Sequence, residues 1–239
     1  MSLDHVADAL QAHAAPISRR AVDAMYADPF WDARFGERGR RRADEDGDFH
    51  VGYLAEALRL GSTAHFANYA RWLRSVLVAR GMCTRHLSEQ LRCVADAVDA
   101  LGALPSPEDA RVVRAYVDAA RDGLRYPEGS LGSRLQDAEP RAAAAAEEAL
   151  AARFYGASDL PPRDRLRADA ADLLSYLADA AALERPDLFA EHAEWLAGFF
   201  ADQRRPDGYL AALREAVARQ PEVERSEVRD LLRGTATAR

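Results

Sequence analysis

The sequence predicts an all-α protein. Apolar residues recur at helical spacing along most of the 239-residue chain, whereas the sustained two-residue alternation typical of strands is missing. A 21-residue segment is also duplicated, and each copy has the periodicity of a helix pair. Together these patterns predict two tandem homologous repeats of about five helices each, packed as helical bundles or in a globin-like arrangement.

The duplicated segment comprises residues 53–73, YLAEALRLGSTAHFANYARWL, and residues 176–196, YLADAAALERPDLFAEHAEWL. The copies align without a gap at an offset of 123 positions, and 10 of the 21 positions are identical. The identical pairs include Tyr53/Tyr176, Leu54/Leu177, Phe66/Phe189, Ala70/Ala193 and Trp72/Trp195. We therefore predict a first repeat over residues 1–125, a connection over residues 126–140 and a second repeat over residues 141–239.

In the first repeat, apolar spacing predicts a helix over residues 3–27 that is interrupted at Pro16. The stretch DPFWDARFGERGRRR, residues 28–42, predicts a loop rich in aromatic residues and arginine. Further helices are expected over residues 42–60, over residues 62–80 and from Thr84 to Leu101. Gly81 is expected to end the second of these helices. Ser106 followed by Pro107 is a strong start signal for a last helix that fades near Gly123.

The second repeat is expected to follow the same order. Residues 126–140 contain two Gly and two Pro without clear periodicity, which predicts the connection between the halves. Helices are then expected from Arg141, over residues 163–183, at Pro186, at Pro206, and after Pro221 near Ser226 and Glu227.

Composition excludes several classes of function. The net charge of −7 disfavours general nucleic-acid binding, and no apolar run is long enough to span a membrane. All 32 basic residues are Arg, which excludes lysine Schiff-base chemistry and a P-loop lysine. Cys83 and Cys93 lie ten residues apart and form no metal-binding spacing, so we expect reduced thiols in a cytoplasmic protein.

The aromatic residues of the duplicated segments are the main candidate site. Phe66, Tyr69 and Trp72 are three positions apart and predict one stripe on a helix. Such a stripe packs in a core, or it lines an apolar pocket that binds a small apolar or amphipathic molecule or a partner protein. The candidate ligand-binding residues are His50, Tyr53, Phe66, Tyr69 and Trp72 in the first repeat, and Tyr176, Phe189, His192 and Trp195 in the second.

No histidine is shared between the two copies, so a symmetric metal or haem site is not expected. His50 follows Asp46 by four residues, which predicts either an imidazole oriented for metal binding or proton transfer, or a solvated helix start. A tetrapyrrole, haem or corrinoid, held by His50 or His192 is the alternative function. The chain lacks Glu-x-x-His and the common catalytic motifs, which favours a non-enzymatic protein over an enzyme with an unrecognised site.

A basic cluster in the predicted loop is the candidate anion-binding site. Arginine binds phosphate or carboxylate groups through two parallel hydrogen bonds. The alternative is neutralisation by Glu45 and the flanking aspartates. The cluster comprises Arg38, Arg40, Arg41 and Arg42.

Residues 48–91 resemble a helical module of bacterial sensory and regulatory proteins, where it precedes a cobalamin-binding domain or another signalling domain. The matching residues are His50, Tyr53, Leu54, Phe66, Tyr69, Trp72, Arg80 and Gly81. The resemblance implies a regulatory or ligand-sensing helical module. This chain has no Asp-x-His-x-x-Gly cobalamin-ligand motif, and His50, Tyr69 and Gly81 are not retained in the second copy, so any site is expected to be asymmetric.

Overall fold

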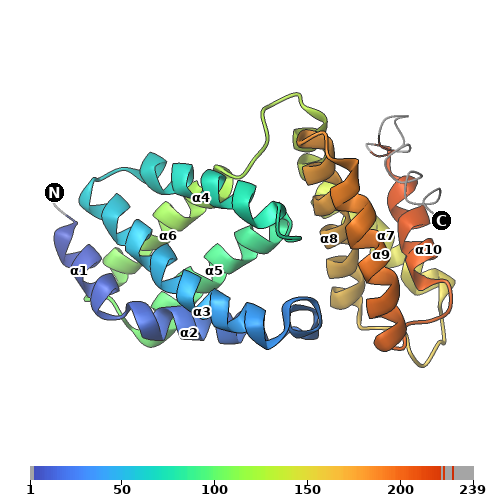
Figure 1. Ribbon diagram of the computed structural model, residues 1–239, viewed down its shortest axis with the longest axis horizontal. Helices are drawn as coiled ribbons and strands as arrows, with labels where there is room; N and C mark the ends of the chain where they lie inside the picture. The colour runs from blue at the N-terminus through green and yellow to red at the C-terminus, as the bar shows by residue number, and fades with distance from the viewer. Residues whose placement is uncertain (1–2, 222, 224–227, 229–239) are drawn as a thin grey trace. The chain divides into compact units, whose positions relative to one another are not determined.

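A computed structural model of the chain describes residues 3–221, 223 and 228 and confirms the all-α class. Over these residues the chain forms ten helices and no strand (Figure 1). It divides into two compact units: unit 1 comprises Met1–Val76 and His86–Leu124, and unit 2 comprises Leu77–Arg85 and Arg125–Arg239. No helix of the described residues combines the length and apolar character needed to cross a membrane.

Unit 1 is built around the long helix α3. The helices that begin before Arg125 are α1 (Asp4–Ala12), α2 (Ala14–Met25), α3 (Pro29–Arg59), α4 (Thr63–Val78), α5 (Thr84–Leu101) and α6 (Pro107–Asp122). Helices α1 and α2 both pack on α3 and bury Leu10 and Ile17 against it. The predicted start of α6 is confirmed, because the Ser106 hydroxyl accepts a hydrogen bond from the Asp109 amide.

The prediction of a loop over residues 28–42 is wrong, because α3 already begins at Pro29. Asp28 caps the helix by accepting from the Phe30 amide, and Phe30 and Trp31 are buried next to the His86 ring. This packing stabilises a helix that local composition does not favour. The helix is kinked at Gly36, where φ is 57°.

Unit 2 is centred on the antiparallel pair α7 (Leu131–Arg153) and α8 (Arg163–Ala182), with α9 (Pro186–Asp202) packed on α8 and α10 (Tyr209–Ala218) packed on α7 (Figure 1). The connection predicted for residues 126–140 is therefore largely helical, and Pro140 lies inside α7. Close packing outweighs the cost of that proline. A Cβ on Gly132 would come within 2.6 Å of the Ala182 Cβ, so α7 and α8 approach closely there. The helix predicted near Ser226 and Glu227 lies outside the described residues.

The helix pairs α3/α4 and α8/α9 share backbone hydrogen bonds at the 123-residue offset. The amides of Ser62 and Arg185 donate to the carbonyls of Ala57 and Ala180, respectively, and the amides of Leu60 and Leu183 donate to Glu56 and Asp179. Gly61 has a φ of 59° and its counterpart Glu184 a φ of 54°. The two connections thus have the same C-terminal capping geometry, although only one has the glycine that this geometry favours.

This capping geometry predicts opposite effects at the two counterpart positions. Glu184→Gly should raise the free energy of unfolding by about 0.5–1 kcal/mol, whereas Gly61→Ala should lower it by about 1 kcal/mol, because side chains disfavour positive φ. Guanidinium unfolding measures both changes. Gly52→Ala is the matched control: Gly52 lies within α3, and an added Cβ would meet nothing within 4 Å, so alanine should stabilise there. A stabilising effect of Gly61→Ala would contradict the assignment.

Candidate functional site

Four aromatic residues of α3 and α4 form a surface that we call the aromatic face: Phe49, Tyr53, Tyr69 and Trp72. The rings of Tyr53 and Tyr69 are stacked, with centroids 4.0 Å apart, and the Trp72 ring lies 6.0 Å from that of Tyr69. Phe49 lies one turn before Tyr53 on the same side of α3. The side chains of Phe49 and Trp72 are 64% and 58% exposed, and that of Tyr53 is 37% exposed.

The predicted stripe of Phe66, Tyr69 and Trp72 divides into a buried and an exposed part. Phe66 and Tyr69 are buried, whereas Trp72 faces solvent. Three residues advance a helix by 300°, so each step rotates the side chain by about 60° and the outer two differ by about 120°. Phe66 and Tyr69 therefore belong to the core, and Trp72 lies at the surface.

His50 contacts Tyr69 of the aromatic face from the interior of unit 1. It is buried within α3, and its Nδ1 lies 2.7 Å from the Tyr69 hydroxyl, so the two side chains share a hydrogen bond whose donor depends on the imidazole tautomer. His50 is therefore not at a solvated helix start, as one interpretation of its position near Asp46 had it. Its Nε2 is buried without a hydrogen-bond partner, and burial lowers the pKa of His50 to about 4. Burial also raises the pKa of Tyr69, and Asp46 and Tyr53 raise it further.

The counterpart residues of α8 and α9 have the same stacking but a different exposure. The rings of Tyr176 and His192 are stacked with centroids 3.4 Å apart, at the positions equivalent to Tyr53 and Tyr69. Tyr176 is only 2% exposed, and His192 and Phe189 are buried. Trp195 stacks on Phe199, with centroids 4.9 Å apart. Of the predicted site residues, Tyr53 and Trp72 are therefore exposed in unit 1, whereas Tyr176, Phe189 and His192 are buried in unit 2.

Tyr176 is buried because a turn of the chain covers it within unit 2. The Tyr176 hydroxyl donates to the Gly81 carbonyl at 2.6 Å. The amide and hydroxyl of Thr84 donate to the buried carboxylate of Asp179 at 2.7 and 2.6 Å, and the Tyr126 hydroxyl donates to the same carboxylate at 2.7 Å. Sequence reasoning missed Asp179, although it is the counterpart of Glu56 in the duplicated segment.

The predicted anion-binding arginines lie on α3 rather than on a loop, and two of them are already paired. Arg40 forms an ion pair with Asp23 and lies over the Tyr26 ring, and Arg41 is 3.5 Å from Glu37. Arg38 and Arg42 are exposed. The acidic partners are Asp23 and Glu37 rather than the Glu45 named by the alternative interpretation, and anion binding by the cluster stays a prediction.

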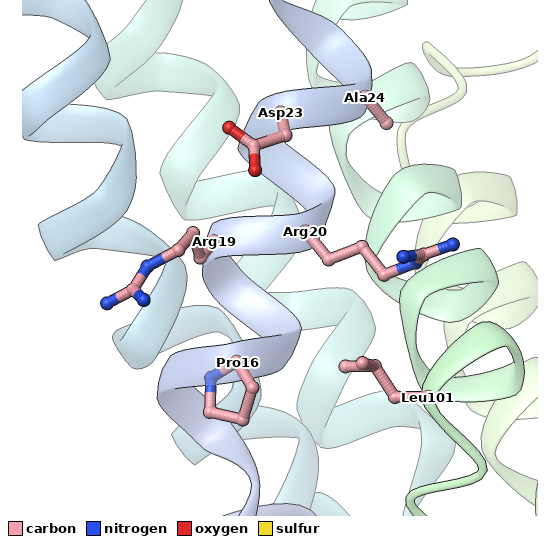
Figure 2. A pocket seen from close by; sticks show the side chains of 6 residues that line it. All are labelled: Pro16, Arg19, Arg20, Asp23, Ala24 and Leu101. Atoms are coloured by element: carbon pink, nitrogen blue, oxygen red, sulfur yellow. The ribbon is translucent and has the colours of Figure 1, made fainter.

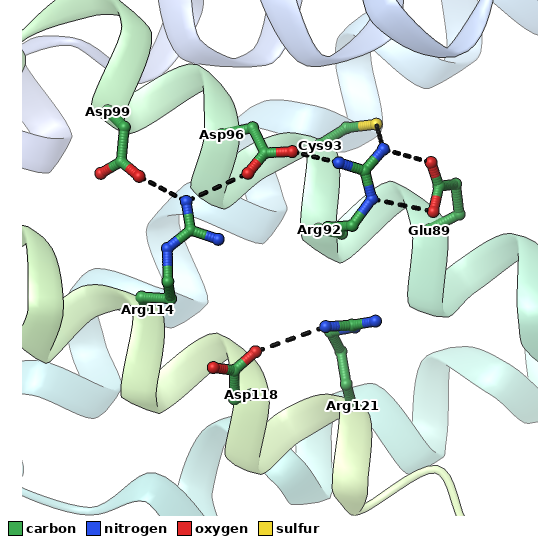
Figure 3. Close-up of polar contacts among 8 residues, drawn as sticks. All are labelled: Glu89, Arg92, Cys93, Asp96, Asp99, Arg114, Asp118 and Arg121. Atoms are coloured by element: carbon green, nitrogen blue, oxygen red, sulfur yellow. Dashed lines mark hydrogen bonds and ion pairs between the residues drawn. The ribbon is translucent and has the colours of Figure 1, made fainter.

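Other arginines of unit 1 are paired in the same way. Figure 3 shows Arg92 between Glu89 and Asp96, and Arg114 bridging Asp96 and Asp99 from the neighbouring helix. A groove of about 460 Å³ is lined by Pro16, Arg19, Arg20, Asp23, Ala24 and Leu101. Its two arginines leave α2 on opposite sides of the helix (Figure 2), so they do not converge on one ligand.

A second cavity, of about 200 Å³, lies beside Arg205 and Tyr209 in unit 2, and neither cavity is lined by His50 or His192. Within the described residues no group of three or more His, Cys, Asp or Glu side chains could hold a metal ion. Tetrapyrrole binding thus remains a prediction from the sequence.

Comparisons with protein-family models, curated proteins and solved structures find no match to this chain.

Burial of His50 predicts a specific pH dependence of stability. Its pKa is about 4 in the folded protein against 6.5 as the ordinary value, so its contribution is complete above pH 6.5 and is lost as the pH falls toward 4. Between about pH 7 and pH 5 this loss amounts to about 2 kcal/mol in the free energy of unfolding. His50→Gln should make that decrease shallower by the same amount in urea titrations.

An equal decrease in the wild type and in His50→Gln would show that His50 does not titrate in this way.

Proposed function

We propose that the protein is a non-enzymatic binding module of a sensory or regulatory kind, and that the aromatic face is its binding surface. The single observation that carries this proposal is the exposure of Trp72 beside the stacked rings of Tyr53 and Tyr69. Exposed aromatic side chains do not contribute the hydrophobic free energy that their burial would contribute. Clusters of such side chains on a protein surface mark interaction sites. Aromatic residues are also the ones that contribute most to binding energy.

The contrast between the two helix pairs supports this proposal. Tyr176 has the same stacked partner position as Tyr53, but it is covered by the turn that contains Gly81. The α3/α4 pair thus has the equivalent stacked rings, but within the described residues no turn of the chain buries Tyr53 as the Gly81 turn buries Tyr176. A bound molecule or protein segment would cover Tyr53.

The groups beneath the aromatic face support binding rather than acid–base catalysis. The Tyr69 hydroxyl and the His50 ring are bonded to each other and buried. The pKa of Tyr69 is raised and that of His50 is lowered, so both groups stay neutral near pH 7. Their hydrogen bond holds the Tyr69 ring in place, which prepares a rigid surface before any ligand arrives. The proposed ligand is a small apolar or amphipathic molecule or a partner protein.

Anilinonaphthalene sulfonate, an apolar fluorescent probe, tests the surface directly. Trp72→Ala should weaken binding of the probe by about tenfold or more, because the exposed indole supplies much of the contact area. Tyr155→Ala is the matched control, since Tyr155 is the most exposed aromatic residue among the exposed large hydrophobic residues and lies outside the aromatic face. Fluorescence titration measures both variants. Equal probe affinity of Trp72→Ala and Tyr155→Ala would overturn the proposal.

A further inference from the structure

The turn that covers Tyr176 has a counterpart elsewhere in the chain. We call residues 77–85 the α4–α5 turn and residues 200–208 the α9–α10 turn; they are related by the same offset of 123 positions. The amides of Gly81 and Arg204 donate to Val78 and Ala201, and those of Met82 and Arg205 donate to Leu77 and Phe200. The backbone hydrogen bonds of the two turns therefore correspond at these two positions, although Arg80 donates to Leu77 whereas its counterpart Gln203 donates to Phe199.

The two turns share one left-handed position and differ at another, because Gly208 has a φ of 76° whereas its counterpart Arg85 lies within α5. Gly81 has a φ of 85°, and Arg204, its counterpart, has a φ of 52°. Arg204 and Glu184 are the non-glycine residues with positive φ in the described chain, and each is the counterpart of a glycine with positive φ. The α9–α10 turn thus presents its Arg204 carbonyl in the same local geometry in which Gly81 accepts from Tyr176.

The receiving surfaces correspond as well. Tyr176 and Asp179 hold the α4–α5 turn, and their counterparts on α3 are Tyr53 and Glu56. Tyr53 and Glu56 are exposed, and so is Arg204 in the α9–α10 turn. The contact between the α4–α5 turn and Tyr176 is formed within unit 2. The equivalent residues, Arg204 in the α9–α10 turn and Tyr53 with Glu56 on α3, are exposed to solvent.

We propose that the α9–α10 turn of a second copy of this chain docks on the aromatic face, with the Tyr53 hydroxyl donating to the Arg204 carbonyl. This inference rests on the proposed function, for which it names the partner. The Arg204 side chain of one copy and the Glu56 carboxylate of the other have opposite charges, which favours the contact. Trp72 and Phe49 beside Tyr53 supply the apolar surface that the turn covers. The contact joins two different surfaces and is therefore heterologous.

One residue of the turn weakens this contact. The counterpart of Thr84, whose amide and hydroxyl both donate to Asp179, is the exposed Asp207. Its carboxylate would lie near that of Glu56, and like charges repel. The self-association is thus a weak one, and replacing Asp207 by Thr removes this repulsion.

Sedimentation velocity on the full chain, over roughly 1 to 100 μM, tests the proposal. The wild type should associate with rising concentration. Glu56→Arg and Arg204→Glu should each weaken association by about tenfold, and the double variant, which exchanges the charges, should recover it. Asp207→Thr should tighten association by about tenfold. Glu128→Arg, a charge reversal at an exposed loop position, should change nothing and serves as the control.

A chain that stays monomeric at the highest concentration, with Asp207→Thr monomeric as well, would overturn this inference. So would association that is indifferent to Glu56→Arg. Binding of the apolar probe separates the two proposals: if Trp72→Ala loses probe binding while the wild type remains a monomer, the aromatic face still binds ligands and only its occupant is wrong. If probe binding does not depend on Trp72, the proposed function itself fails.

Discussion

The buried carboxylate of Asp179 is the interaction on which the difference between the two helix pairs depends. It accepts hydrogen bonds from the amide and hydroxyl of Thr84 and from the hydroxyl of Tyr126, so it joins α8 to two other segments of unit 2. A buried carboxylate is stable only when its oxygens are satisfied in this way. By fixing the start of α5, Asp179 places the Gly81 carbonyl over Tyr176. On α3 the equivalent position is the exposed Glu56, and the equivalent tyrosine is open.

The two helix pairs therefore have similar backbones but differ in the exposure of their equivalent tyrosines. Phe66 and Phe189 are both buried, the Tyr53/Tyr69 and Tyr176/His192 pairs both stack, and the connecting turns have the same hydrogen bonds. The pairs differ in that the turn containing Gly81 buries Tyr176, whereas Tyr53 is exposed. In unit 1 an exposed tryptophan stands beside a tyrosine that a buried histidine holds, and this rigid apolar surface is what the binding proposal uses.

Sequence reasoning predicted what depends on local pattern. The duplicated segment predicted both helix pairs, and Ser106 with Pro107 predicted the start of α6. It failed where distant contacts decide. The helix at Pro29 depends on Phe30 and Trp31 packing next to His86, more than fifty residues away, and α7 tolerates Pro140 because it packs closely on α8. The exposure of Trp72 and the burial of Tyr176 follow from which turn covers which helix, and no local pattern in either segment carries that information.

The central claim is that Tyr53 is open while its counterpart Tyr176 is closed. Nitration by tetranitromethane, located by mass spectrometry of peptides, compares the two hydroxyphenyl rings within one sample of dilute protein. Tyr53 is 37% exposed and Tyr176 is 2% exposed, and the Tyr176 hydroxyl donates to the Gly81 carbonyl. We therefore predict that Tyr53 is nitrated before Tyr176. Nitration of Tyr176 as fast as that of Tyr53 would contradict the account, because it would mean that the two counterpart surfaces are equally accessible.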